Sequence, residues 1–96
     1  MPASNTPDII GKTLERAFGF TLRRLRQDRG LSQENLGFES GYHRTYISLL
    51  ERGQKSPSLQ TIFTLSKALK IEPNEMIRQV ESKNIEFVKN MKKNDY

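Results

Sequence analysis

The sequence predicts an all-α fold of five helices with a C-terminal helical extension. Apolar residues recur every three or four positions along most of the chain, which is the period of one face of an α-helix. Glycine follows three of these segments and serine or proline precedes three of them, and both patterns are typical of helix ends. The chain has no internal repeat and no long heptad array, so the helices are expected to pack into one small domain.

The composition excludes several classes of function. With 96 residues and no cysteine, the chain has room for one small core and cannot form disulfides or thiolate metal sites. Its one histidine, His43, leaves no histidine cluster for a metal and no nucleophile and base for catalysis. We therefore expect no metal, no cofactor and no enzymatic activity.

The hydropathy pattern and the charge indicate where the protein works and what it binds. No stretch approaches the ~18 apolar residues of a membrane-spanning helix, and the N-terminus lacks the pattern of a signal peptide, so a cytoplasmic protein without a membrane partner is expected. The net charge is +5 with a pI near 9.7, and most of the excess lies in residues 13–80. This charge suits a polyanionic partner, although an ordinary solvated surface explains it equally well.

The N-terminal part divides into an arm and a helix. Residues 1–12 combine two prolines and a glycine with few apolar groups, which predicts a flexible arm. A helix is then expected from Thr13 to about Arg29, ended by Gly30. Gly19 interrupts its apolar stripe, which consists of Leu14, Phe18, Leu22 and Leu25.

Two short helices are expected next. Ser32 is a suitable N-cap for a helix that ends at Gly41, and residues 43–52 form the following helix before Gly53. Helices this short depend on tertiary contacts. The side chains expected to hold them in the core are Leu36, Ile47 and Leu50.

The last two helices open at Ser58, a suitable N-cap, and at Pro73, a suitable first-turn residue. Together with residues 13–57 they complete a domain that spans residues 13–80. The side chains expected to face inward are Leu59, Ile62, Phe63, Ser66 and Leu69 in the fourth helix, and Met76, Ile77 and Val80 in the fifth.

Residues 81–96 form a C-terminal extension that is too apolar to be a purely solvated tail. They continue the stripe of the fifth helix if that helix extends, and the residues concerned are Ile85, Phe87, Val88 and Met91. The extension could pack on its own domain, on a second subunit or on another protein. Membrane binding is the weakest alternative because the charges of the segment are mixed in sign.

A short helix, a glycine turn and a second short helix form the outline of a helix-turn-helix. The spacing that sharpens this outline is carried by Gln33, Gly37, Gly41, Ile47 and Leu50. The run from Leu22 to Met76 resembles the phage repressor/Cro-type (XRE family) DNA-binding domain, and residues 44–48 are especially similar to restriction–modification controller proteins. The sequence departs from the family at Gly37, usually alanine, and at Phe38, usually a polar residue.

The resemblance implies that the third helix enters the major groove of duplex DNA. Its exposed face would then contact bases through Arg44, Thr45, Ser48 and Leu49. Arg44 can donate two hydrogen bonds to guanine, although it could instead contact only a phosphate. His43 stands where the family has a capping residue, and we expect a partly exposed loop histidine without a role in preference to a pH switch.

Contacts to the DNA backbone are expected on both sides of the third helix. Gln33 begins the second helix, where backbone N–H groups and the macrodipole favour a phosphate. Tyr46 could lie along the sugar–phosphate backbone or at the edge of the core. Past the third helix, Gln54, Lys55 and Ser56 would contact the neighbouring strand, although each could also be plain surface.

The resemblance also implies a structural ion pair and a dimer. Arg26 and Glu51 would pair across the first and third helices and fix the orientation of the third. A homodimer would form through the last helices.

The function that the sequence predicts is a sequence-specific transcriptional regulator, acting as a homodimer on a short palindromic operator. The alternative is an antitoxin-like interaction module that binds a partner protein through residues 81–96 and binds DNA only secondarily.

Overall fold

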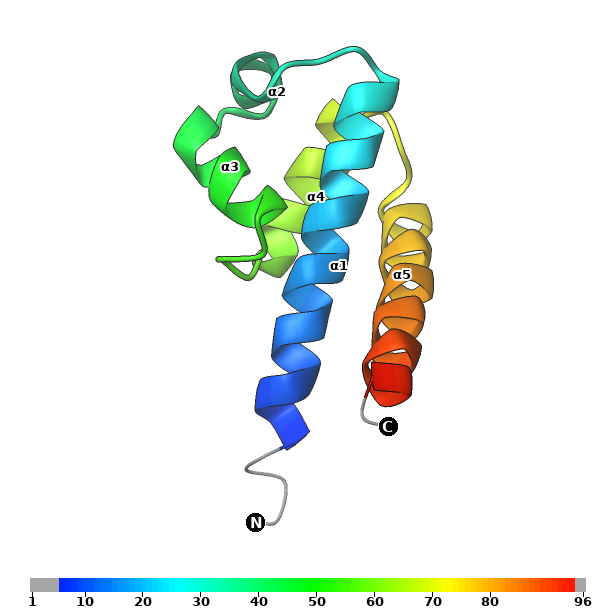
Figure 1. Cartoon of the computed structure of the whole chain (residues 1–96). Helices are drawn as coiled ribbons and strands as arrows, with labels where there is room; N and C mark the ends of the chain where they lie inside the picture. The colour runs from blue at the N-terminus through cyan, green and yellow to red at the C-terminus, as the bar shows by residue number, and fades with distance from the viewer. Residues whose placement is uncertain (1–5, 95–96) are drawn as a thin grey trace.

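The computed structural model describes residues 6–94 and the side chains of residues 11–91. This part of the chain forms five helices and no strand, as predicted. In Figure 1 the two long helices, α1 and α5, lie side by side in opposite directions. Of the three short helices, α3 packs against α1, α2 packs against α3 and α4, and α4 packs against α5. The helices are α1 (Thr6–Asp28), α2 (Gln33–Ser40), α3 (Arg44–Glu51), α4 (Leu59–Ala68) and α5 (Pro73–Asn94).

Both long helices extend beyond the expected boundaries. α1 begins at Thr6, so the expected arm was wrong for residues 6–12, while residues 1–5 lie outside the described part. Pro7 falls in the first turn of α1, where the missing N–H costs nothing, so it opens the helix instead of preventing it. α5 continues without a break to Asn94, which makes the described part of the C-terminal extension a direct continuation of the fifth helix.

The core contains side chains from all five helices. It is built from Ala17, Phe18, Leu22, Leu36, Ile47, Leu50, Leu65, Leu69, Met76 and Val80. The expected core residues of α2 and α3 are therefore confirmed. α2 and α3 are each eight residues long, so these few buried side chains are what hold them in place.

Four side chains that were expected to face inward are exposed, and for these the prediction was wrong. They are Leu14 in α1, Leu59 and Phe63 in α4, and Ile77 in α5. Leu14 and Ile77 border one hollow that α1, α4 and α5 share, which leaves both side chains partly open to solvent. Ala17 and Leu65 take the inward positions instead, because these faces of α1 and α4 meet the other helices.

The departure from the family at Gly37 has a structural reason. A Cβ built on Gly37 would stand 2.5 Å from the carbonyl oxygen of Tyr42, so α2 and the turn before α3 approach more closely than a side chain allows. Gly41, with a φ of 83°, then ends α2 by donating its backbone N–H to the carbonyl of Gly37. These two glycines set the angle between α2 and α3.

Candidate nucleic-acid interface

The helix-turn-helix consists of α2, the turn at residues 41–43, and α3. His43 is the N-cap of α3, because its Nδ1 accepts a hydrogen bond of 3.0 Å from the backbone N–H of Thr45. The expectation of a loop histidine without a role was therefore wrong. A cap requires only a lone pair at the correct position, and the neutral imidazole supplies it in place of a hydroxyl or carboxylate.

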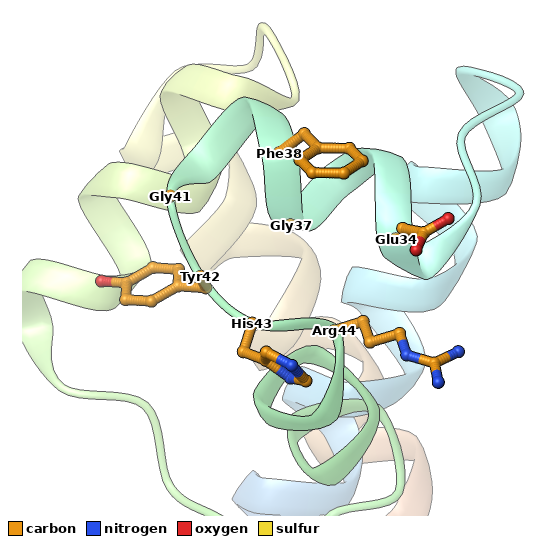
Figure 2. A pocket seen from close by; sticks show the side chains of 7 residues that line it. All are labelled: Glu34, Gly37, Phe38, Gly41, Tyr42, His43 and Arg44. Carbon is orange, nitrogen blue, oxygen red and sulfur yellow. The ribbon is translucent and has the colours of Figure 1, made fainter.

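The outer face of α3 carries the four side chains expected to contact bases. Arg44 and Thr45 are exposed and Ser48 and Leu49 are half-buried, while Ile47 on the opposite face is fully buried. Figure 2 shows Arg44 at the start of α3 with its guanidinium directed away from the turn. Arg44 has no ion pair among the described residues, so its donors remain available to a ligand.

Arg26 and Glu51 lie in contact and join α1 to the end of α3. The guanidinium donates two hydrogen bonds to the carboxylate, Nε to Oε2 at 2.6 Å and Nη2 to Oε1 at 2.9 Å. Its third nitrogen donates to the carbonyl of Leu31 at 2.8 Å. The side chains are only 10% and 4% exposed, and the hydrogen bond to Glu51 raises the pKa of Arg26 although burial lowers it. The pair fixes α3 without occupying its outer face.

Gln33 belongs to the same hydrogen-bonded group. Its Nε2 donates to Oε1 of Glu51 at 3.0 Å, so the side chain is half-buried against the ion pair. The backbone N–H groups at the start of α2 are less fully occupied, because the side chain of Ser32 accepts a hydrogen bond only from the backbone N–H of Asn35. At this position the backbone, more than the side chain of Gln33, is available to a phosphate.

The loop after α3 presents exposed side chains at residues 54–56. Gln54 and Lys55 make no side-chain hydrogen bond or ion pair within the described part of the chain. Ser56 donates its hydroxyl to Oε2 of Glu15 in α1 at 2.8 Å. Of the three residues, Gln54 and Lys55 are therefore free for an external partner, whereas Ser56 holds the loop against α1.

Tyr46 lies at the edge of the core, which was one of its two expected positions. Its hydroxyl is 3.2 Å from Oγ1 of Thr61, and its ring is 5.1 Å from the ring of Tyr42. Thr61 is buried and its hydroxyl also meets those of Tyr42 at 3.2 Å and Ser58 at 2.9 Å. Sequence reasoning missed this cluster of four hydroxyl groups, because residues so far apart along the chain give no local signal.

Phe38, which stands where the family usually has a polar residue, projects from α2 and is 79% exposed. It lines a hollow between α2 and the start of α3, together with Glu34, Tyr42, His43 and Arg44 (Figure 2). Nothing in the structure explains the aromatic side chain at this position.

The described residues contain no other kind of site. No three carboxylate or histidine side chains among them come together as metal ligands. No described helix is both long enough and apolar enough to cross a lipid bilayer.

A short helix, a glycine turn and a second helix with a free polar outer face define a helix-turn-helix DNA-binding protein. The helix-turn-helix family model matches residues 22–76, and the chain belongs to this family, in its XRE-type branch of non-enzymatic transcriptional regulators.

Among its members, the chain is closely related to restriction–modification controller proteins. It is 44% identical over 61 residues to control protein C.BamHI of Bacillus amyloliquefaciens, and the match covers 62% of this chain and 75% of that protein. The crystal structure of the controller protein C.AhdI from Aeromonas hydrophila is 50% identical with a TM-score of 0.63, covering 65% of this chain and 94% of that one.

A second similar structure contains DNA. It is the controller protein C.Esp1396I, solved as a tetramer in complex with its natural 35 base-pair operator. Its TM-score is 0.69 at 24% identity, and the match covers 75% of this chain and 95% of that one, which is a likeness of fold.

Proposed function

We propose that this controller-type regulator binds a specific palindromic operator as a homodimer, with α3 in the major groove. The observation that carries the proposal is the division of α3 into two faces. Ile47 and Leu50 are fully buried and the Arg26–Glu51 pair holds the end of the helix, while Arg44 and Thr45 are exposed. A rigid helix with a free polar face can enter a groove with little loss of side-chain freedom elsewhere.

Base recognition is assigned to the outer face of α3. Arg44 donates two hydrogen bonds to a guanine, and Thr45 offers a hydroxyl or a methyl group to a neighbouring base. Ser48 and Leu49 make the adjacent contacts further along the helix. Positioning on the backbone comes from the N-terminus of α2 at Gln33 and from the loop at Gln54 and Lys55.

The homodimer is supported by the apolar side chains that this monomer leaves exposed. Leu14, Ile77 and Phe63 are exposed on α1, α5 and α4, and Leu59 lies one turn before Phe63. Leu14 and Ile77 also line one apolar hollow with Ile62. A second copy that covers this surface would bury side chains that water solvates poorly.

A regulator of DNA acts where the DNA is, which places the protein in the cytoplasm of a bacterium or of a phage-infected cell.

The antitoxin-like alternative is supported by one feature of the extension. Ile85 and Met91 remain exposed on α5, while Phe87 packs against the domain. A partner protein could cover these two side chains. A second copy covers them equally well, so the alternative requires a protein other than this chain to bind here.

Selection of bound duplexes from a random DNA pool tests the proposal. The expected product is a palindrome whose half-sites are centred about 10–10.5 base pairs apart, or a multiple, because both α3 helices must enter the same face of the duplex. Light scattering of the complex should give two chains for each such palindrome. Absence of any enriched sequence would contradict the proposal, and enrichment of a single half-site would contradict the dimer.

A further inference from the structure

The outer face of α3 does not end at Ser48. Arg52, the C-cap of α3, follows Ser48 by four residues, as Ser48 follows Arg44, so it continues the line of these two residues just past the end of the helix. Arg52 is exposed, and its Nε donates to the carbonyl of Ser48 at 3.4 Å. The face proposed to enter DNA therefore ends in a guanidinium group.

Arg52 leads directly into a pocket of about 200 Å³ where α3, α1 and α5 meet. Its lining consists of Arg16, Phe20, Arg23, Glu51, Arg52 and Phe87. Three guanidinium groups and one carboxylate thus share this pocket, and the carboxylate, Glu51, already accepts two hydrogen bonds from Arg26. The pocket consequently carries positive charge that no lining residue neutralises.

Apart from Nε of Arg52, which donates to Ser48, the three arginines keep their side-chain donors available. None of them is paired with a carboxylate among the described residues, and Arg23 has no hydrogen-bond partner there either. The guanidinium of Arg16 lies 4.9 Å from the ring centroid of Phe87, a contact that orients the group through its π face and leaves its N–H groups free at the edge. This ring packs edge-on against Phe20, at 6.3 Å between centroids.

Such a pocket has the chemistry of a phosphate site. Guanidinium groups present parallel N–H donors that match the oxygens of a phosphate, and aromatic walls exclude water from one side. We infer that Arg16, Arg23 and Arg52 hold a backbone phosphodiester of the bound DNA, next to the groove that α3 occupies. Because Phe87 belongs to residues 81–96, the C-terminal extension then builds part of the DNA-binding surface. The inference rests on the DNA binding of the proposed function and extends its footprint onto α1 and α5.

The chain offers a matched control for the test. Arg24 is the next residue of α1 and carries the same charge, but its guanidinium donates to Gln79 of α5, outside this pocket. Arg23→Ala and Arg24→Ala thus remove one exposed arginine each from adjacent positions of one helix. Circular dichroism and thermal unfolding of both variants establish that each is folded before binding is measured.

The measurement is the affinity for the selected operator, and for a scrambled duplex of equal length, over a series of salt concentrations. Arg23→Ala should weaken binding to both duplexes several-fold and make the slope of log K against log salt shallower by about 1 per subunit. Arg24→Ala should leave the slope unchanged. Arg23→Lys should keep most of the wild-type slope, because the slope depends on how many phosphates are neutralised and only weakly on the geometry of each contact. A shorter operator that keeps only the base pairs under the two α3 helices lacks the phosphate assigned to the pocket. The wild type and Arg23→Ala should bind this shorter operator with equal affinity.

A free phosphate has the same chemistry as a DNA phosphate, so inorganic phosphate is titrated separately while the arginine side-chain NMR signals are observed. The inference is overturned if the arginine signals shift in free phosphate while Arg23→Ala binds DNA as tightly as the wild type. The pocket would then be assigned to a free anion. Equal DNA binding by Arg23→Ala and Arg24→Ala overturns it as well. Both results leave the proposed function intact if the wild type still selects a palindrome, whereas loss of sequence preference in the wild type itself is a failure of the proposed function.

Discussion

Gly19 of α1 lies directly against the backbone of Glu51 at the end of α3. A Cβ built on Gly19 would stand 2.5 Å from the carbonyl oxygen of Glu51, and equally close to the carbonyl oxygen of Leu50. The two helices therefore meet backbone to backbone at this point, which only glycine permits. The residue that weakens the apolar stripe of α1 in the sequence is the one that allows α3 to dock.

Gly19→Ala is expected to destabilise the protein, by about 1–3 kcal/mol, because the added methyl group must push α1 away from α3. Gly11 is the matched control, since a Cβ on it meets nothing within 4 Å. Gly11→Ala should stabilise the protein by about 0.5–1 kcal/mol through helix propensity. Urea unfolding of both variants checks the pair. If Gly19→Ala stabilises the protein as Gly11→Ala does, α1 and α3 do not meet closely at Gly19.

Arg26→Ala and Glu51→Ala should each lower stability by about 3–5 kcal/mol, because each leaves a buried charge without its partner. The double variant should cost less than the sum, since the second truncation no longer isolates a charge. A double-mutant cycle from urea unfolding gives the coupling energy. Strictly additive losses would mean that the pair makes no energetic contribution.

Thr61→Val should destabilise the protein by about 1–3 kcal/mol, because the hydroxyls of Tyr42, Tyr46 and Ser58 lose their shared partner. Thr64→Val in the same helix is the control, as Thr64 is half-buried and has no such cluster. Thermal unfolding compares the two variants. Equal effects would indicate that the cluster adds nothing beyond the burial of a threonine.

Arg44→Ala should cost about 1–3 kcal/mol per half-site on the selected operator and little on scrambled DNA, because it removes a contact to one base. Lys55→Ala should weaken both duplexes alike and reduce the salt slope by about 1 per subunit, because it removes a contact to a phosphate. Fluorescence anisotropy with both duplexes distinguishes the two roles. If Arg44→Ala weakens both duplexes equally, Arg44 contacts the backbone and base recognition moves to Thr45, Ser48 or Leu49.

Glu75 and Arg78 form an ion pair near the start of α5, and this pair should make stability depend on acidic pH. Hydrogen bonds from Arg78 and then Gln79 lower the pKa of Glu75 from its usual 4.5 to about 2. Because the pKa of Glu75 is lowered in the folded state, the ionised carboxylate stabilises the fold above pH 4.5. This contribution is lost as the pH falls toward 2. The stability advantage of the wild type over Glu75→Gln should therefore shrink between pH 4.5 and pH 2 in urea unfolding. In an Arg78→Ala background most of this pH dependence should disappear, and a persistent one would assign it to another group.

Several features of the fold follow from short stretches of sequence, and these were predicted. Ser32 and Ser58 each accept a backbone hydrogen bond at the start of their helices, at 3.0 Å in both cases, as expected of N-caps. The left-handed turns at Gly30 and Gly41 likewise end α1 and α2. The Arg26–Glu51 pair was implied by the family resemblance and not by any local pattern.

The sequence by itself determined where helices two to five begin and which outer face of α3 is polar, because caps, turns and periodicity act over a few residues. Only the tertiary structure decided which edge of each apolar stripe is buried, since burial depends on the neighbouring helix, and this is why Leu14 and Ile77 are exposed. The same holds for contacts between distant segments. Tyr46 meets Thr61, and Arg23 shares a pocket with Phe87, because packing brings together residues that carry no signal of each other along the chain.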